Sequence, residues 1–235
     1  MQALLDLIPS LNYGAYVSQW KADYVPSDGL GRVNSGSAVL SRWPITSGRR
    51  IALPLIGAQS AIKQYFYLRR AILDTRVQVP GMGKVAVLNV HTAAYAVDDT
   101  KKRHVELFKE ELDRVHADKI FFVAGGDLNT LPPDASKMSG FSDSVCEDED
   151  FNVERDKAEL TFMLPYYKDY APAITRAAYV EDEKAHFTHS VSQYVFWNRK
   201  LDYLFTNGKV KEEGQTHQKT MGLSDHCPVS AVFAK

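Results

Sequence analysis

Four apolar, strand-like runs of the sequence carry, at or near their ends, side chains capable of acid–base or metal chemistry. These side chains are His91, Asp127, Asn129, Asp202, Asp225 and His226. Asp202 interrupts the apolar run LDYLF, where a carboxylate is costly unless paired, and an imidazole is its natural partner. Each position alone is also typical of a turn, because Asp and Asn bond their own backbone. Four separate turns explain the pattern less well than one shared site.

The stretch FFVAGGDLNT (121–130) sets Asp127 and Asn129 two positions apart behind two glycines. Side chains two apart on an extended backbone point the same way, so we expect this pair to face one site. Gly125 and Gly126 lack side chains, which lets another backbone or a substrate come close. A turn that simply ends the strand explains the same residues equally well.

The composition is that of a globular protein. The 235 residues are 45% hydrophobic and 24% charged, which argues against a disordered, fibrous or membrane-spanning chain. The formal net charge of -1 gives no overall attraction to nucleic acid or anionic lipid. We interpret Cys146 and Cys227 as two free thiols, because a disulfide framework needs more cysteines in a smaller chain.

The N-terminal residues predict a short helix rather than a secretory signal. Ala3, Leu4, Leu7 and Ile8 fall on one helical face, and Pro9 ends the pattern. A basic segment followed by an apolar core and a small-residue cleavage site is lacking. As defaults we expect a soluble monomer in the cytoplasm, with a secreted or periplasmic location left open.

The remaining pattern predicts a mixed α/β protein of a single domain, residues 1–235. Short runs rich in β-branched and aromatic residues predict strands at 37–41, 65–79, 85–90, 120–124, 201–206 and 229–233. Apolar residues three or four apart predict a helix over 100–118, with Thr100 as its N-cap. The PGMG at 80–83 is too short for a crossover helix, so its two strands pair antiparallel.

The ordered set GSAVLSRWPI, NVHT, GGDLNT, RKLDYLF and LSDHCPV resembles the endonuclease/exonuclease/phosphatase superfamily, from about Gly36 to the last strand. Each motif is weak alone, but their order and separation are specific. The resemblance implies a DNase I-like fold, a four-layer αββα sandwich of two mixed sheets. It also implies a divalent-metal-dependent phosphoester hydrolase, which we interpret as a phosphodiesterase or nuclease.

The resemblance implies a role for each candidate residue. Asp127 would orient or deprotonate the attacking water, and Asn129 would help to hold water and phosphate. His226, oriented by Asp202, would contact the scissile phosphate. His91 would stabilise the phosphate or protonate the leaving group. The metal, Mg²⁺ or Mn²⁺, would be held by Asp225 with Asp127 and Asn129, because these ions prefer oxygen ligands.

The sequence departs from the family at its start. Family members begin with a strand ending in Asn and a second ending in a Glu that is the principal metal ligand, and neither is found here. We therefore expect an N-terminally truncated domain with weak or no activity of its own. The alternative is a catalytically silent member that binds a phosphate ester or a protein.

The substrate class stays open among nucleic acid, lipid head group and sugar phosphate. Aromatic residues in LPYYKDYAPAITRAAY could stack on bases, but we favour core packing for them. The acidic run at 147–150 is interpreted as a solvated loop. HFTH, with His186 and His189, is interpreted as a loop rather than a zinc site, and Arg199 and Lys200 as exposed residues at a strand start.

Overall fold

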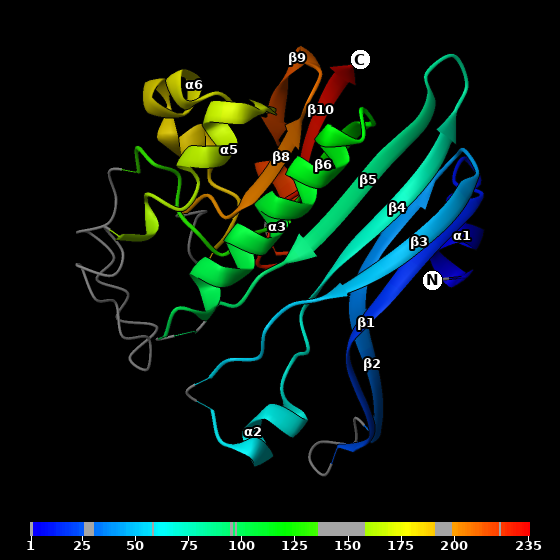
Figure 1. Ribbon diagram of the computed structural model, residues 1–235, viewed down its shortest axis with the longest axis vertical. Helices are drawn as coiled ribbons and strands as arrows, with labels where there is room; N and C mark the ends of the chain where they lie inside the picture. Colours follow the sequence, from blue (N-terminus) through cyan, green and yellow to red (C-terminus); the bar gives the residue numbers. More distant parts are fainter. Residues whose placement is uncertain are drawn as a thin grey trace. The chain divides into compact units, whose positions relative to one another are not determined.

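The computed structural model describes residues 2–25, 31–57, 59–94, 96, 98–135, 158–190, 199–220 and 222–235 (Figure 1). Cys146 and the acidic run at 147–150 lie outside these residues. The chain divides into two compact units, Met1–Ala124 and Gly125–Lys235. A single domain for the whole chain stays a prediction, and each unit is described here by itself.

The first unit is built on strands in the order β3-β4-β5-β6. Their bounds are β3 (Ile45–Ala52), β4 (Ala71–Val79), β5 (Gly83–His91) and β6 (Phe121–Asp127), the last of which ends in the second unit. β3 pairs antiparallel with β4, and β4 with β5. Gly81 and Gly83 both have a φ of 76°, the left-handed conformation that makes this tight β4–β5 hairpin possible. The predicted antiparallel pairing is therefore confirmed.

The long helix α3 (Thr100–Ala117) follows β5, as predicted. Its buried residues include Val105, Phe108 and Leu112, which recur at helical spacing. The predicted N-cap is wrong, because Asp99 occupies that position and Thr100 is the first helical residue. The amide of Thr100 instead donates to the Asp98 carboxylate at 3.0 Å, so a carboxylate two residues upstream satisfies this free donor.

The rest of the first unit comprises α1 (Gln2–Leu7), α2 (Ala61–Phe66) and an antiparallel pair of long strands, β1 (Tyr13–Val25) and β2 (Gly31–Ser41). The short N-terminal helix was predicted, whereas β1 was not. The strand predicted over 65–79 is wrong at its start: residues 65–66 end α2, and the strand begins at Ala71. Ser60 caps α2 by accepting from the Lys63 amide, which favours helix there.

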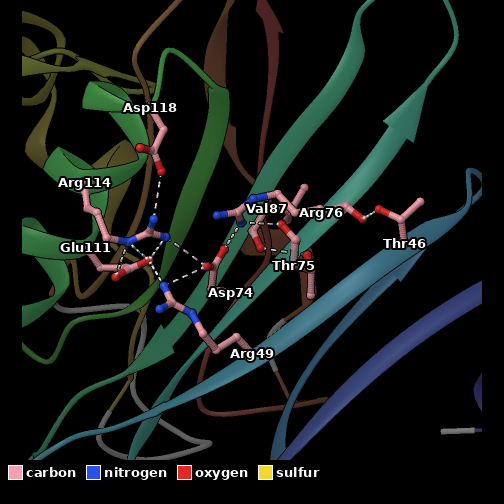
Figure 2. Close-up of polar contacts among 9 residues, drawn as sticks. All are labelled: Thr46, Arg49, Asp74, Thr75, Arg76, Val87, Glu111, Arg114 and Asp118. Carbon is pink, nitrogen blue, oxygen red and sulfur yellow. Dashed lines mark hydrogen bonds and ion pairs between the residues drawn. The ribbon is translucent and has the colours of Figure 1, made fainter.

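Ion pairs hold α3 against β3 and β4 (Figure 2). We call this group the arginine cluster; it comprises Arg49, Asp74, Arg76, Glu111 and Arg114. Asp74 is 3% exposed and receives contacts from all three guanidinium groups, with Arg49 Nη2 3.2 Å and Arg114 Nη2 3.6 Å from its Oδ2. Buried carboxylates of this kind require paired charges.

In the second unit, the strand order is β6-β8-β7, and β9 pairs antiparallel with β10. The strands are β7 (Ala171–Pro172), β8 (Asp202–Thr206), β9 (Lys209–Thr216) and β10 (Val229–Ala234). The helices are α5 (Leu164–Asp169) and α6 (Arg176–Glu181), followed by the short 3-10 helices η2 (Glu183–His186) and η3 (Gln218–Thr220). No helix in the described part of the chain combines the length and apolar character needed to cross a membrane.

Aromatic side chains fill the core of the second unit. Tyr166 and Tyr179 are almost fully buried, as is Phe205, and the rings of Tyr166 and Phe205 lie 5.3 Å apart. The packing interpretation of the aromatic stretch at 164–179 is therefore confirmed for these two tyrosines. Burial raises the pKa of Tyr179, and its hydroxyl donates to Glu183 at 2.6 Å.

Candidate active site

Five of the six predicted site residues belong to the second unit. They occupy the end of β6, the start of β8 and the turn before β10, and they are Asp127, Asn129, Asp202, Asp225 and His226. The sixth, His91, is the last residue of β5 in the first unit. Its assignment to the phosphate or the leaving group stays a prediction.

The two glycines at the end of β6 let its backbone pass close to β8. A Cβ on Gly125 would lie 1.9 Å from the carbonyl oxygen of Tyr203, so no other residue fits without backbone movement. Gly126 has a φ of 133°, a conformation reserved for glycine. The amide of the fully buried Leu128 donates to the Leu201 carbonyl at 3.0 Å. These contacts fix the position of Asp127 between them.

Asp127 and Asn129 meet, but not as side chains of one extended strand. The strand ends at Asp127, and Asn129 adopts a left-handed φ of 46°, which Asn tolerates better than most residues. Its backbone amide donates to Asp127 Oδ1 at 2.8 Å, and its side-chain nitrogen donates to Oδ2 at 3.1 Å. The turn interpretation is therefore confirmed for this pair, and the turn itself orients the carboxylate, whereas the shared site stays a prediction.

His226 lies between two carboxylates. Its Nδ1 is 2.7 Å from Asp202 Oδ2, and its Nε2 is 3.8 Å from Asp127 Oδ2. The hydrogen bond with Asp202 fixes the ring orientation and directs Nε2 toward Asp127. Burial lowers the pKa of His226, but the hydrogen bond and the charges of the surrounding carboxylates outweigh it, so the pKa is raised. The imidazole partner expected for Asp202 is thus present.

Two buried side chains that sequence reasoning did not select hold Asp202 in place. The Thr188 hydroxyl is fully buried and accepts from the amides of Leu201 and Asp202 at 3.0 and 3.1 Å. Lys200 was expected to be exposed, and that expectation is wrong: it is 1% exposed and donates to the Asp202 carbonyl at 2.8 Å. Its ammonium also lies 4.8 Å from the Tyr203 ring centroid, a cation–π contact that compensates for lost water. Burial lowers the pKa of Lys200 to about 8.

His189, which the sequence analysis assigned to a loop rather than to the site, lies against His226. Its ring meets the His226 ring edge-on, with the centroids 4.6 Å apart. An isolated β-bridge joins His189 to His226, and the Ser190 amide donates to the Asp225 carbonyl at 2.9 Å. Burial first, and then the neighbouring His226, lower the pKa of His189 to about 4, so its ring is neutral at pH 7. His189 follows the buried pair Phe187–Thr188, so it shows the pattern that selected the other positions: a polar side chain at the end of a buried run.

Three of these side chains are close enough to share a metal ion. Donor atoms of His189, Asp225 and His226 all lie within 4.8 Å of one another. The Asp225 carboxylate is exposed, so it is also able to bind a hydrated ion such as Mg²⁺, which usually keeps several waters. Both oxygens of Asp127 already accept hydrogen bonds from Asn129. We call the five residues Asp127, His189, Asp202, Asp225 and His226 the histidine cluster.

The sequence matches the model of the Endonuclease/Exonuclease/phosphatase family over residues 2–148. The match includes His91, Asp127 and Asn129, and it ends before Asp202. A search of curated proteins gives no match.

Solved structures of this family have a similar fold. One is an endonuclease/exonuclease/phosphatase from Beutenbergia cavernae, with 20% identity and a TM-score of 0.67 over 98% of this chain. The chain spans 56% of that protein. Truncated TDP2 from Caenorhabditis elegans (16% identity, TM-score 0.55) covers 99% of this chain, which spans 79% of it. The mannosyl-6-phosphatase Bt3783 of Bacteroides thetaiotaomicron has 13% identity and a TM-score of 0.56. The match covers all of this chain and 80% of the phosphatase. The predicted DNase I-like α/β fold is confirmed.

Proposed function

The chain belongs to the endonuclease/exonuclease/phosphatase family, and from this premise we propose that it hydrolyses phosphoesters, specifically phosphodiesters, with a divalent metal. The observation that carries the proposal is the arrangement of His226 between Asp202 and Asp127, at 2.7 and 3.8 Å. An imidazole between two carboxylates is a group suited to binding an anion at one nitrogen while the other is held in place.

Hydrolysis of a phosphoester requires an activated water and stabilisation of the charge on the phosphoryl oxygens. We infer that Asp127 accepts a proton from the attacking water or orients it; this role is supported by a carboxylate that Asn129 fixes and that is only partly buried. His226 carries a proton more readily than an ordinary histidine, since its pKa is raised. Its Nε2–H then donates to a phosphoryl oxygen, while Asp202 accepts from Nδ1–H and keeps the ring in that orientation.

Asp225, with Asp127 and Asn129, would hold Mg²⁺ or Mn²⁺ at the exposed side of the cluster. When bound, such an ion supplies charge stabilisation at the phosphoryl oxygens. His91 would assist at the phosphate or the leaving group. The substrate remains a phosphoester of nucleic acid, lipid head group or sugar phosphate.

The test is hydrolysis of bis-p-nitrophenyl phosphate by the 235-residue chain with Mg²⁺, with Mn²⁺ and with a chelator. Asp127→Asn should lower kcat by on the order of 100-fold or more, because the carboxylate that handles the water is lost. The matched control is Glu212→Gln, which also turns a carboxylate into an amide, but on the exposed face of β9.

Metal-dependent activity that is lost in Asp127→Asn and kept in Glu212→Gln supports the proposal. Absence of metal-dependent activity on this diester both in the folded 235-residue chain and in a version extended upstream contradicts it and favours a member that binds without cleaving. p-Nitrophenyl phosphate, assayed in parallel, separates diester from monoester hydrolysis.

A further inference from the structure

The donor atoms of His189, Asp225 and His226 differ in kind from those that the proposed function uses for Mg²⁺. Two are imidazole nitrogens and one is a carboxylate oxygen, all within 4.8 Å of one another. Mg²⁺ prefers an all-oxygen environment, whereas imidazole suits Zn²⁺, Co²⁺ and Ni²⁺. We propose that these three side chains form a transition-metal site that takes Zn²⁺ and, by doing so, switches off hydrolysis at the same centre.

His189 has the properties of a ligand without another role. Its Nδ1 is buried and has no hydrogen-bond partner among the described residues, which is unfavourable for a polar atom. The backbone of His189 is fixed, because its amide donates to the Arg199 carbonyl at 2.9 Å and bridges connect it to Arg199 and His226, and its ring packs edge-on against His226. A neutral imidazole held this firmly offers a lone pair to a metal at little cost in conformational entropy.

His226 offers only one nitrogen to a metal. Nδ1 is engaged by Asp202, so Nε2 is the nitrogen that could bind a metal. Histidines that bind metals usually donate their other N–H to a carboxylate, an arrangement that fixes the tautomer and raises the basicity of the ligating nitrogen. Asp202 has this position relative to His226. The same hydrogen bond therefore prepares the ring for two different occupants.

The geometry requires only a modest closure. Zn–N distances of roughly 2.0–2.1 Å in a tetrahedral site put neighbouring ligand atoms about 3.3 Å apart. The present spacing is at most 4.8 Å. Asp225 is exposed, and the one side-chain hydrogen bond described for its carboxylate is a 3.2 Å contact from the neighbouring Ser224 hydroxyl, so rotation toward the two rings would not disturb the core. Two histidines and one carboxylate, with a fourth position for water, are also a common ligand set for zinc.

Zinc at this site would remove His226 Nε2 and the Asp225 carboxylate from the reaction. The proposed function uses that nitrogen to donate to the phosphoryl oxygen and that carboxylate to hold Mg²⁺. Inhibition by zinc therefore rests on the proposed function, whereas zinc binding itself does not. The two parts are tested by separate measurements on the same protein.

Binding is measured first, by titrating Co²⁺ into the whole 235-residue chain and following its visible absorption, then displacing it with Zn²⁺. We expect one equivalent of Co²⁺ with the intense bands of a four-coordinate ion. His189→Gln should weaken binding at least tenfold, and Asp225→Asn should do so as well. His116→Gln, at the exposed end of α3, is the matched control and should bind as the unsubstituted protein does.

Equal affinity in His189→Gln and the unsubstituted protein, with both shown to be folded by circular dichroism, overturns the site. Loss of binding in His189→Gln but not in Asp225→Asn would also overturn the proposed ligand set. Inhibition is measured next, with Mg²⁺ in excess: the zinc concentration for half-inhibition should rise at least tenfold in His189→Gln. One-equivalent binding by a chain that hydrolyses nothing would support the site and contradict the proposed function.

Discussion

Carboxylates gather in both units of this protein, but they are paired with different kinds of cation. In the arginine cluster of the first unit, Asp74 and Glu111 are surrounded by three guanidinium groups (Figure 2). In the histidine cluster of the second unit, Asp127 and Asp202 flank an imidazole. A guanidinium stays charged throughout the physiological range, whereas an imidazole gains and loses its proton near neutrality.

This difference separates a structural cluster from a chemical one. The arginine cluster neutralises charge permanently, and its ion pairs connect α3 to the strands beneath it. The histidine cluster leaves a proton on His226 available for donation and a lone pair on His189 available for a ligand. Buried carboxylates alone do not indicate a site; the titratable or metal-binding nature of their partners does.

The largest effect is expected from removing the central charge of the arginine cluster. Asp74→Asn keeps the size of the side chain, but it leaves Arg49 and Arg114 with Glu111 as their shared carboxylate and removes the carboxylate that Arg76 contacts. Breaking a buried ion pair costs about 3–5 kcal/mol, and we expect the lower end because Arg49 and Arg114 are about half exposed. Urea unfolding measures the change. Asp113→Asn, on the exposed face of α3, is the control and should alter stability by less than about 0.5 kcal/mol.

The second effect concerns activity rather than stability. Asp202→Asn should lower kcat on bis-p-nitrophenyl phosphate by on the order of 100-fold, about 2.7 kcal/mol, because an amide no longer holds the His226 tautomer. The comparison predicts the opposite pattern for the arginine cluster: Asp74→Asn should lower stability but leave kcat of the folded fraction nearly intact. Equal losses of kcat in both variants would contradict the separation into structural and chemical clusters.

Much of the fold follows from apolar periodicity. β4, β5, β6, β8 and β10 were predicted from their runs of β-branched and aromatic residues, although β10 is only partly buried. β1 was not, because its sequence mixes polar residues such as Gln19 and Lys21 with apolar ones, and much of the strand is exposed. In its pairing with β2, the partners lie from 6 residues apart in sequence (Val25 and Gly31) to 28 residues apart (Tyr13 and Ser41), so most of the contacts are not recorded in any local pattern.

The candidate site divides in the same way. Asp202 was given an imidazole partner because a carboxylate in an apolar run needs one, and that argument requires only local sequence. The burial of Lys200 and Thr188 could not be predicted from local sequence, because it depends on backbone atoms brought close by folding. These atoms are the carbonyl of Asp202 and the amide of Leu201. His189 is a strand-end polar residue like the others, but the local sequence does not show that a bridge brings it to His226, 37 residues later.

The third prediction uses pH to sharpen the view of the arginine cluster. Burial raises the pKa of Glu111, but hydrogen bonding to Arg114 and the charges of two arginines outweigh it, so the pKa is lowered. A lowered carboxylate pKa contributes stability above the unfolded value near 4.5, and that stability is lost as the pH falls through the folded value. The stability gap between the unsubstituted protein and Glu111→Gln should therefore be constant above about pH 5.5 and narrow below 4.5. A stability gap that widens as the pH falls would contradict this prediction, because it would mean that the folded protein favours the protonated form of Glu111.

The smallest effect is expected at the exposed end of the same helix. Arg114 Nη1 lies 2.8 Å from Asp118 Oδ2, which is shorter than the 3.6 Å from Arg114 Nη2 to Asp74 Oδ2 in the arginine cluster, but about half of each side chain is exposed. Water screens such a pair, and helical i, i+4 pairs contribute only about 0.3–0.5 kcal/mol. Asp118→Asn should therefore lower the free energy of unfolding by no more than that, and 0.5 M salt should abolish the difference. A loss approaching that of Asp74→Asn would mean that burial does not distinguish the two contacts of Arg114, and that distance alone sets their strength.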